Sequence, residues 1–195
     1  MGRKTLADTR KPEILMNYYK TIIEEGYENA SIPNIAKRMK VYPNLITHYF
    51  KSKEQLELSF VEYIRDEYIN AFTDIIEENE LNVKHHKRLV RVLFGKKWSS
   101  LIDDSVFFAL FSQTFRNIKI KKEFQKVFKK YHKVITEVLE KSNVENAQNA
   151  SMLIIMLVEG YYLFRSLKIN FNYETFSKYL EKILEMALSS GNKKN

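Results

Sequence analysis

The stretch Val41-Tyr-Pro-Asn-Leu-Ile-Thr-His-Tyr-Phe50 decides how the first part of the chain folds. Its apolar residues recur at positions i, i+1, i+4 and i+5, which is the spacing of one helix face; they are Leu45, Ile46, Tyr49 and Phe50. Pro43 can occupy the first turn of such a helix, where its missing N–H group costs nothing. Asn44, Thr47 and His48 then project from the opposite face. Short polar side chains of this kind can reach base edges in the major groove of DNA.

A second short helix is predicted just before this stretch. Ser31 is a good N-cap, and apolar residues follow it at i, i+3, i+4 and i+7 between Ile32 and Met39. The interval from Met39 to Tyr42 leaves room only for a tight turn. Two short helices joined by such a turn form a helix-turn-helix, whose second helix enters the major groove.

The segment from Ser31 to Leu56 resembles the DNA-binding head of the tetracycline-repressor (TetR) family. The residues in register with the family pattern are Ile35, Ala36, Val41, Ile46, His48, Tyr49, Phe50, Lys53 and Leu56. The chain departs from the pattern at three positions. Lys40 stands where the turn usually has Gly, Tyr42 where a Ser or Thr cap is usual, and Thr47 where Tyr is commonest. We therefore expect the turn to hold Lys40 in a left-handed conformation.

The resemblance also implies roles for individual residues of the head. In the family, the residues at the registers of Tyr49 and Lys53 both contact DNA phosphates. We expect the DNA-binding residues to be Ser31, Tyr42, Pro43, Asn44, Thr47, His48, Tyr49 and Lys53. Two alternatives stay open, because His48 can instead fill a gap beside Tyr27 and Tyr42 can be a packing residue.

The composition predicts an all-α protein. The 195 residues include only 5 Gly and 3 Pro, and all three Pro lie within the first 43 residues. So few helix breakers in a long chain favour helices throughout. Helical spacing of apolar residues predicts about nine helices, over residues 13–25, 32–39, 43–50, 53–78, 84–100, 105–117, 122–141, 145–168 and 173–189. We expect a basic N-terminal arm over residues 1–11.

Two domains follow from this pattern, a helix-turn-helix head over residues 1–52 and an effector-binding and dimerisation body over 53–195. The predicted core of the three-helix head consists of Ile14, Tyr18, Ile22, Ile35, Ala36, Met39, Ile46 and Phe50. Because this core is small for its number of residues, we expect the following helix to complete it. The sequence Ser52-Lys-Glu-Gln55 is a capping box, which predicts that this helix starts at residue 53.

The last two predicted helices carry the expected dimer interface. The segment Met152–Val158 is apolar nearly all round, which is typical of a helix buried on several sides. The helix over 173–189 keeps a single apolar stripe. The resemblance implies the same arrangement, because the family forms homodimers through its last two helices as a four-helix bundle.

The body also holds candidates for an effector site. They are Trp98, Phe107, Phe111, Phe115, Glu159 and Tyr162, and ordinary core packing is the alternative for each aromatic residue. Glu159 lies in the most apolar helix, where a carboxylate must be hydrogen-bonded, paired or neutral. It can pair with Arg165, form a hydrogen bond that locks the helix at Gly160, or meet a cationic or hydroxylated effector. The family resemblance implies an effector, and the sequence does not identify it.

Catalysis finds little support in the sequence. There is no Gly-rich phosphate loop, no His–Glu metal pair at helical spacing and no Cys. His85 and His86 would point about 100° apart on a helix and cannot easily share a metal. We therefore expect neither an enzyme nor a metal or other cofactor. The lack of Cys, of an apolar signal segment and of a bilayer-spanning run predicts a cytoplasmic protein.

The charge of the chain favours a polyanionic partner, with a net charge of +8 and a pI of about 9.4. With the resemblance, this predicts a transcriptional regulator, a repressor that a small molecule releases from a palindromic double-stranded DNA operator. Repression rests on the resemblance alone. The alternative is a helical scaffold or membrane-surface adaptor that uses the basic runs at 84–97 and 116–133 without operator specificity. We prefer to interpret those runs as solvated helix faces.

Overall fold

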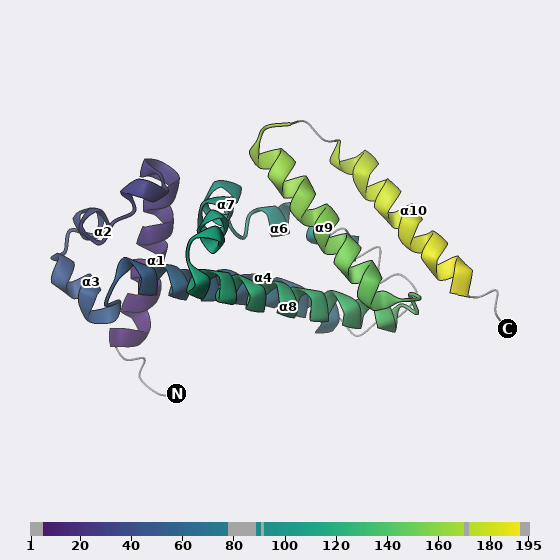
Figure 1. Ribbon diagram of the computed structural model, residues 1–195, viewed down its shortest axis with the longest axis horizontal. Coiled ribbons are helices and arrows are strands. Elements are labelled where there is room, and N and C mark those ends of the chain that lie inside the picture. Colours follow the sequence, from purple (N-terminus) through teal and green to yellow (C-terminus); the bar gives the residue numbers. More distant parts are fainter. Residues whose placement is uncertain (1–5, 78–88, 91, 170–171, 192–195) are drawn as a thin grey trace. The chain divides into compact units, whose positions relative to one another are not determined.

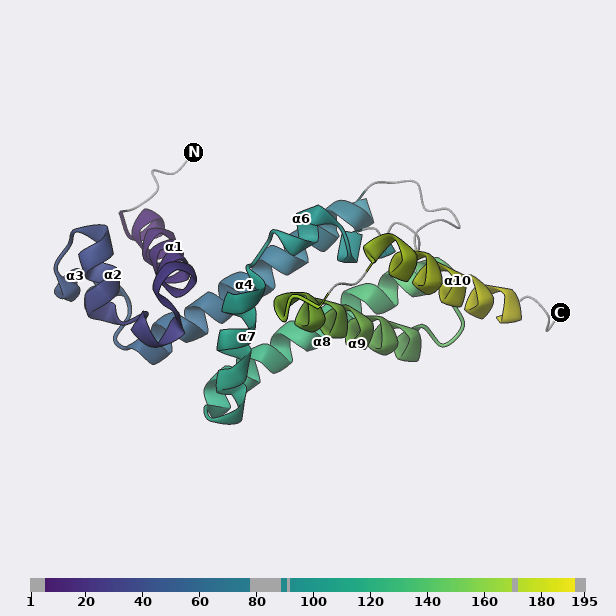
Figure 2. The same cartoon turned by 90° about the horizontal axis from the view of Figure 1, so that it is seen from above.

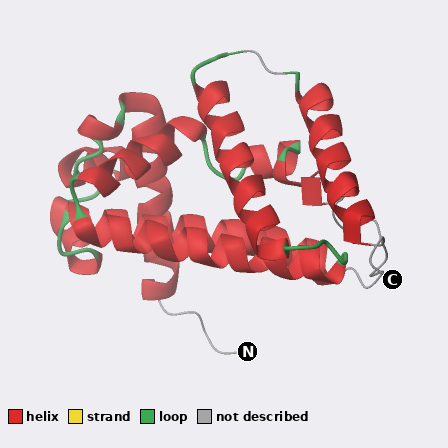
Figure 3. Ribbon diagram, turned by 45° about the vertical axis from the view of Figure 1, so that its right-hand side comes forward, coloured by secondary structure: helices red, strands yellow, loops and turns green. Residues whose placement is uncertain are grey.

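The computed structural model describes residues 6–77, 89–90, 92–169 and 172–191. All regular elements in these residues are helices, which confirms the all-α class (Figure 3). They are labelled in Figure 1: α1 (Leu6–Glu25), the 3-10 helix η1 (Tyr27–Asn29), α2 (Ile32–Met39), α3 (Pro43–Tyr49), α4 (Lys53–Glu77), α6 (Lys96–Ser99), α7 (Asp104–Ser112), the 3-10 helix η2 (Gln113–Phe115), α8 (Ile118–Lys141), α9 (Ala147–Ser166) and α10 (Tyr173–Gly191). The break predicted at 79–83 and most of the helix predicted over 84–100 lie outside the described residues.

The chain divides into two compact units. Unit 1 contains residues 1–64 and 105–124, and unit 2 contains residues 65–104 and 125–195. Helices α4 and α8 each contribute their first part to unit 1 and the rest to unit 2. The domain boundary after residue 52 stays a prediction.

Unit 1 contains the predicted core of the head. Seven of the eight predicted core residues are buried, and Met39 is half-buried. Leu56 and Phe60 of α4 are fully buried with them. The Phe60 ring meets the edge of the Tyr18 ring at a centroid distance of 5.5 Å. The fourth helix therefore completes the core of the head, as predicted.

The turns of the head are fixed by local caps. The Ser31 hydroxyl accepts a hydrogen bond from the Asn34 N–H at 3.3 Å, which confirms Ser31 as the N-cap of α2. Lys40 ends α2 with φ 56° and ψ 42°, the predicted left-handed conformation. The next residue, Val41, donates its N–H to the Ala36 carbonyl at 3.0 Å and so closes the turn. A side chain in this conformation costs about 1–2 kcal/mol relative to Gly.

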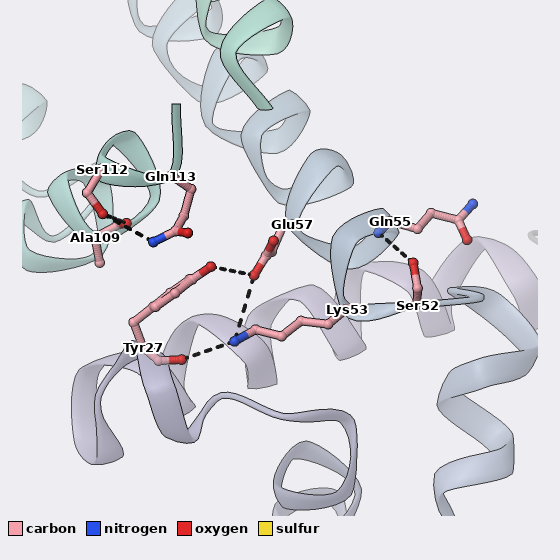
Figure 4. Close-up of polar contacts among 8 residues, drawn as sticks. All are labelled: Tyr27, Ser52, Lys53, Gln55, Glu57, Ala109, Ser112 and Gln113. Carbon is pink, nitrogen blue, oxygen red and sulfur yellow. Dashed lines mark hydrogen bonds and ion pairs between the residues drawn. The ribbon is translucent and has the colours of Figure 1, made fainter. Parts of the chain in front are cut away.

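The predicted capping box opens α4 (Figure 4). The Gln55 N–H donates to the Ser52 hydroxyl at 3.2 Å, and the Gln55 side-chain oxygen accepts from the Lys51 N–H at 2.7 Å. The reciprocal bond therefore reaches one residue further back than in the ideal box. The helix begins at Lys53, as predicted.

The first helix is longer than predicted. It begins at Leu6 instead of residue 13, so the predicted arm over residues 1–11 is wrong for residues 6–11. Pro12 lies inside α1, and Arg10 donates to Glu13 across it at 2.7 Å. Residues 1–5 of the predicted arm lie outside the described residues.

The predicted boundary between residues 117 and 122 is also wrong. Helix α7 ends at Ser112 and is followed by η2, while α8 already begins at Ile118. The Asn117 side-chain oxygen accepts the N–H groups of Lys119 at 2.9 Å and Ile120 at 3.3 Å. Asn117 is therefore the N-cap of α8 rather than the end of the preceding helix.

Unit 2 ends with the antiparallel pair α9 and α10, which lie side by side in two views (Figure 1, Figure 2). The rings of Tyr161 on α9 and Phe176 on α10 stack at a centroid distance of 5.9 Å. The Phe94 ring meets both, at 5.2 Å and 5.3 Å. Aromatic contacts thus hold the last two helices together. Within the described part of the chain, none of the helices is long and apolar enough to cross a membrane.

Candidate DNA-binding and effector sites

Helix α3 buries its apolar face and exposes its polar face. Ile46 is buried, whereas Pro43, Asn44 and His48 are exposed. Tyr42, just before the helix, is 85% exposed, so it has no packing role in the core of this chain. The face predicted to read DNA is therefore open to solvent.

His48 does not fill a gap beside Tyr27. Its ring meets the half-buried Tyr49 edge to face at 5.1 Å, while the Lys53 ammonium lies over the Tyr27 ring at 4.3 Å. The packing alternative for His48 is therefore wrong.

Ser31 and Thr47 are half-buried and already make local hydrogen bonds. Ser31 caps α2, and the Thr47 hydroxyl donates to the Asn44 carbonyl at 3.2 Å. A hydroxyl that donates in this way keeps its oxygen lone pairs as acceptors. Thr47 can therefore accept a hydrogen bond from a base amino group while its own proton stays in the helix.

The basic residues around the turn differ in their availability. Arg38 makes a two-pronged ion pair with Glu24, with both N–O distances 2.6 Å, and this pair lowers the pKa of the Glu24 carboxyl. Arg38 thus joins α2 to α1. Lys37, Lys40 and Lys51 are exposed and can approach DNA phosphates.

Lys53 belongs to a polar network in the first turn of α4 (Figure 4). Its ammonium lies 3.4 Å from the Tyr27 carbonyl oxygen, to which it donates, and 3.8 Å from a Glu57 carboxylate oxygen. The Tyr27 hydroxyl donates to the same carboxylate at 2.7 Å. Burial raises the pKa of Glu57, while the Tyr27 hydrogen bond and the Lys53 charge act against this rise. An ammonium has three N–H donors, so Lys53 can contact a phosphate without leaving Tyr27.

The six candidate effector residues fall into two clusters, one in each unit. In unit 1, Phe107 and Phe111 meet the buried Phe124 ring at centroid distances of 5.7 Å and 5.4 Å. Phe115 is 82% exposed and contacts Phe111 at 6.1 Å. Phe107 and Phe111 therefore pack in a local aromatic core, and Phe115 lies at its surface.

The second cluster, in unit 2, contains Trp98, Tyr162 and Glu159. The buried Trp98 ring lies between Tyr68, at a centroid distance of 4.7 Å, and Tyr131, at 5.5 Å. The buried Tyr162 donates its hydroxyl to the Leu93 carbonyl at 2.7 Å. The negative charge of Glu159 is, after burial, the largest cause that raises the pKa of both Tyr68 and Tyr131. Glu159 therefore faces the same aromatic cluster.

The predicted pairing of Glu159 with Arg165 is wrong. Arg165 instead makes a two-pronged ion pair with Asp104, with both N–O distances 2.7 Å, and its guanidinium covers the Tyr162 ring at 4.3 Å. Burial raises the pKa of Glu159 to about 7, and the charge of Asp104 adds to this rise.

Sequence analysis missed three members of this cluster, Tyr68, Tyr131 and Asp104. Tyr68 and Tyr131 lie in helices whose apolar periodicity was recognised, but periodicity alone does not show which residues from distant helices meet. Within the described ranges, no group of three or more His, Asp or Glu could hold a metal ion.

Two family models match the chain and together extend over both of its parts. Residues 19–59 match the model "Bacterial regulatory proteins, tetR family", and residues 81–189 match "Tetracyclin repressor-like, C-terminal domain". The second model alone spans more than half of the chain. The protein therefore belongs to the TetR family of DNA-binding transcriptional regulators, a non-enzymatic family.

Solved structures share the fold at low sequence identity. A TetR transcription regulator from Haloarcula marismortui superposes with a TM-score of 0.81 at 14% identity, over 91% of this chain and 97% of that one. A transcriptional regulator from Saccharomonospora viridis in complex with choline gives 0.73 at 16% identity, over 90% and 95%. The fatty acid degradation regulator FadR from Bacillus halodurans gives 0.69 at 18% identity, over 94% and 96%. No curated protein matches the chain in sequence.

Proposed function

We propose that the protein is a dimeric repressor that binds a palindromic operator through α3 and leaves it when a small molecule binds the body. The observation that carries this proposal is the exposed polar face of α3, next to exposed lysines, in a head of the TetR family. Residues 1–52 would bind DNA, and residues 53–195 would bind the effector and dimerise. Ser31, Pro43, Asn44 and Tyr49 would help to position α3 on the duplex.

The proposed dimer surface lies on α9 and α10. Large apolar side chains are exposed there at helical spacing: Met152, Leu153, Met156, Leu163, Phe164 and Leu167 on α9, and Tyr179, Ile183 and Met186 on α10. An exposed apolar area of this extent marks an interaction site on a soluble protein. A second copy of the chain would cover it, because two neighbouring helices from each chain form a four-helix bundle.

Gly160 lies in the middle of the exposed apolar stripe of α9. A Cβ atom added there would meet nothing within 4 Å in the single chain, so packing inside the chain does not require glycine. Glycine inside a helix is nonetheless about 1 kcal/mol less favourable than alanine. Close approach of a helix from the second copy would explain why this position lacks a side chain.

A Gly160→Leu variant should therefore weaken the dimer, because the new side chain would separate the two α9 helices. Sedimentation equilibrium should show a dimer Kd at least tenfold higher than that of the wild type. The matched control is Gly160→Ala in a chain kept monomeric by Met156→Glu, where the free energy of unfolding should rise by about 1 kcal/mol. If Gly160→Leu dimerises as tightly as the wild type, the helices do not cross at Gly160.

The relatives with a similar fold suggest different effectors. The choline complex shows that a TetR-like body can bind a compact cation, whereas FadR regulates fatty acid degradation. In this chain, the candidate residues of unit 2 favour the first kind of ligand, because they include an acid among aromatic rings. Phe107, Phe111 and Phe115 stay candidates for contacts to a larger effector.

Repression can be tested with a reporter gene placed behind the operator. We expect expression to fall when the wild-type protein is present and to recover when the effector is added. The control is an operator with its half-sites scrambled, which should leave expression unchanged. An increase in expression with the intact operator would show activation and would contradict the proposed repression.

A further inference from the structure

Glu159 has no described partner for its charge. Among the residues that the structure describes, none donates a hydrogen bond to its carboxylate, and the nearby Arg165 is taken by Asp104. A largely buried carboxylate without a partner is costly in its charged form. The side chain is half-buried rather than sealed, so a solute can reach it.

The walls around Glu159 are aromatic. Trp98 packs against both Tyr68 and Tyr131, and the charge of Glu159 acts on both of these tyrosines. The negative face of an aromatic ring attracts a cation within about 6 Å of its centre, and Trp is the most effective ring. The same cluster thus offers a carboxylate and aromatic faces, the two groups that recognise organic cations.

We propose that Glu159, with Tyr68, Trp98 and Tyr131, binds a compact organic monocation such as a quaternary ammonium. As the effector, this cation rests on the proposed function, in which a small molecule binds the body. A single available carboxylate matches one positive charge. An anionic acyl compound would be repelled by both Glu159 and Asp104.

Protonation should be coupled to binding of the cation. The charged groups that face Glu159 are Asp104, which raises its pKa, the Asp104-bound Arg165, and the phenols of Tyr68, Tyr131 and Tyr162, which stay neutral because burial raises the pKa of the first two. Free Glu159, with a pKa of about 7, is partly protonated at neutral pH. A bound cation favours the carboxylate, so affinity should rise with pH and binding should release protons.

The direct test is isothermal titration calorimetry of the full-length protein with choline and with its neutral carbon isostere, 3,3-dimethylbutan-1-ol. We expect saturable choline binding and at least tenfold weaker binding of the neutral alcohol. Choline affinity should rise about tenfold from pH 6 to pH 8. Glu159→Gln should lower it at least tenfold and remove the pH dependence. Glu137→Gln, on the exposed side of α8, is the matched control and should change neither.

Three results would overturn the inference: no saturable binding of choline or tetramethylammonium, equal binding of the neutral isostere, or unchanged choline binding by Glu159→Gln. If that variant does not fold, the wild type decides, since a pH-independent choline affinity also overturns the inference. Release of labelled operator is measured separately by fluorescence anisotropy. Choline that binds through Glu159 but leaves the operator bound would refute effector release while the cation site stands.

Discussion

A Met156→Glu variant is expected to be monomeric and to lose operator binding. Met156 is 60% exposed on the proposed dimer surface of α9, so the single chain tolerates a charge there. In the dimer, two symmetry-related carboxylates would be buried without partners, at a cost of about 4 kcal/mol or more. That corresponds to about a thousandfold increase in the dimer Kd. A monomer has one head and makes half of the DNA contacts.

Sedimentation velocity measures the dimer, and fluorescence anisotropy with a labelled operator measures DNA binding. Ile118→Glu is the matched control, because Ile118 is also an exposed apolar residue but lies on α8, away from the proposed surface. It should stay dimeric and bind the operator as the wild type does. A folded Met156→Glu protein that still sediments as a dimer would place the interface elsewhere.

The second large effect is expected from Thr47→Ala and His48→Ala. Both residues lie on α3, and each good contact to a base edge contributes about 1–3 kcal/mol of discrimination. The double variant should therefore lose about tenfold or more of its preference for the operator over a site with the contacted base pairs changed. Binding to unrelated DNA should stay nearly the same, because phosphate contacts carry no sequence information.

Lys53→Ala provides the contrast, since it should weaken binding to all sequences about equally. Because Lys53 also contacts Tyr27 and Glu57, a second variant is needed to separate DNA binding from folding. Glu57→Gln keeps a partner for the Tyr27 hydroxyl and releases Lys53 from its ion pair, so affinity for all sequences should hold or increase. Relative affinities over a panel of single-base operator variants decide the matter. An unchanged panel for His48→Ala would remove His48 from base reading.

Much of the head could be predicted because its signals are local. Ser31 and Ser52 are caps whose partners lie three residues away, and the left-handed Lys40 follows from a turn too short for any other geometry. The buried residues of α1 to α3 repeat at helical spacing, so the pattern identifies the core without knowledge of the rest of the chain.

The errors at helix ends also have local causes. Pro12 suggested that α1 starts after it, but a proline removes only one hydrogen bond, and the helix extends back to Leu6. Asn117 was read as the end of one helix, although Asn favours the N-cap and here begins α8. A residue type that suits both the end and the beginning of a helix leaves the boundary ambiguous.

The effector site was predictable only in part because its members come from distant segments. Glu159 was identified by one acid in an apolar helix, but Asp104 lies 61 residues before its partner Arg165 and no local pattern connects them. The aromatic residues show the same limit. Phe107 and Trp98 look alike in sequence, yet the first packs in unit 1 and the second lies beside Tyr68 and Tyr131 in unit 2.

The most direct test of the proposed operator-binding function is a nuclease footprint of the purified protein on the DNA that flanks its own gene. A dimer with two α3 helices should protect two inverted half-sites about one helical turn apart, centred about 34–36 Å from each other or at a multiple of that distance. Protection should persist against an excess of unrelated DNA. Uniform coating of the fragment that salt removes, with no protected palindrome, would contradict sequence-specific operator binding and support a non-specific basic scaffold.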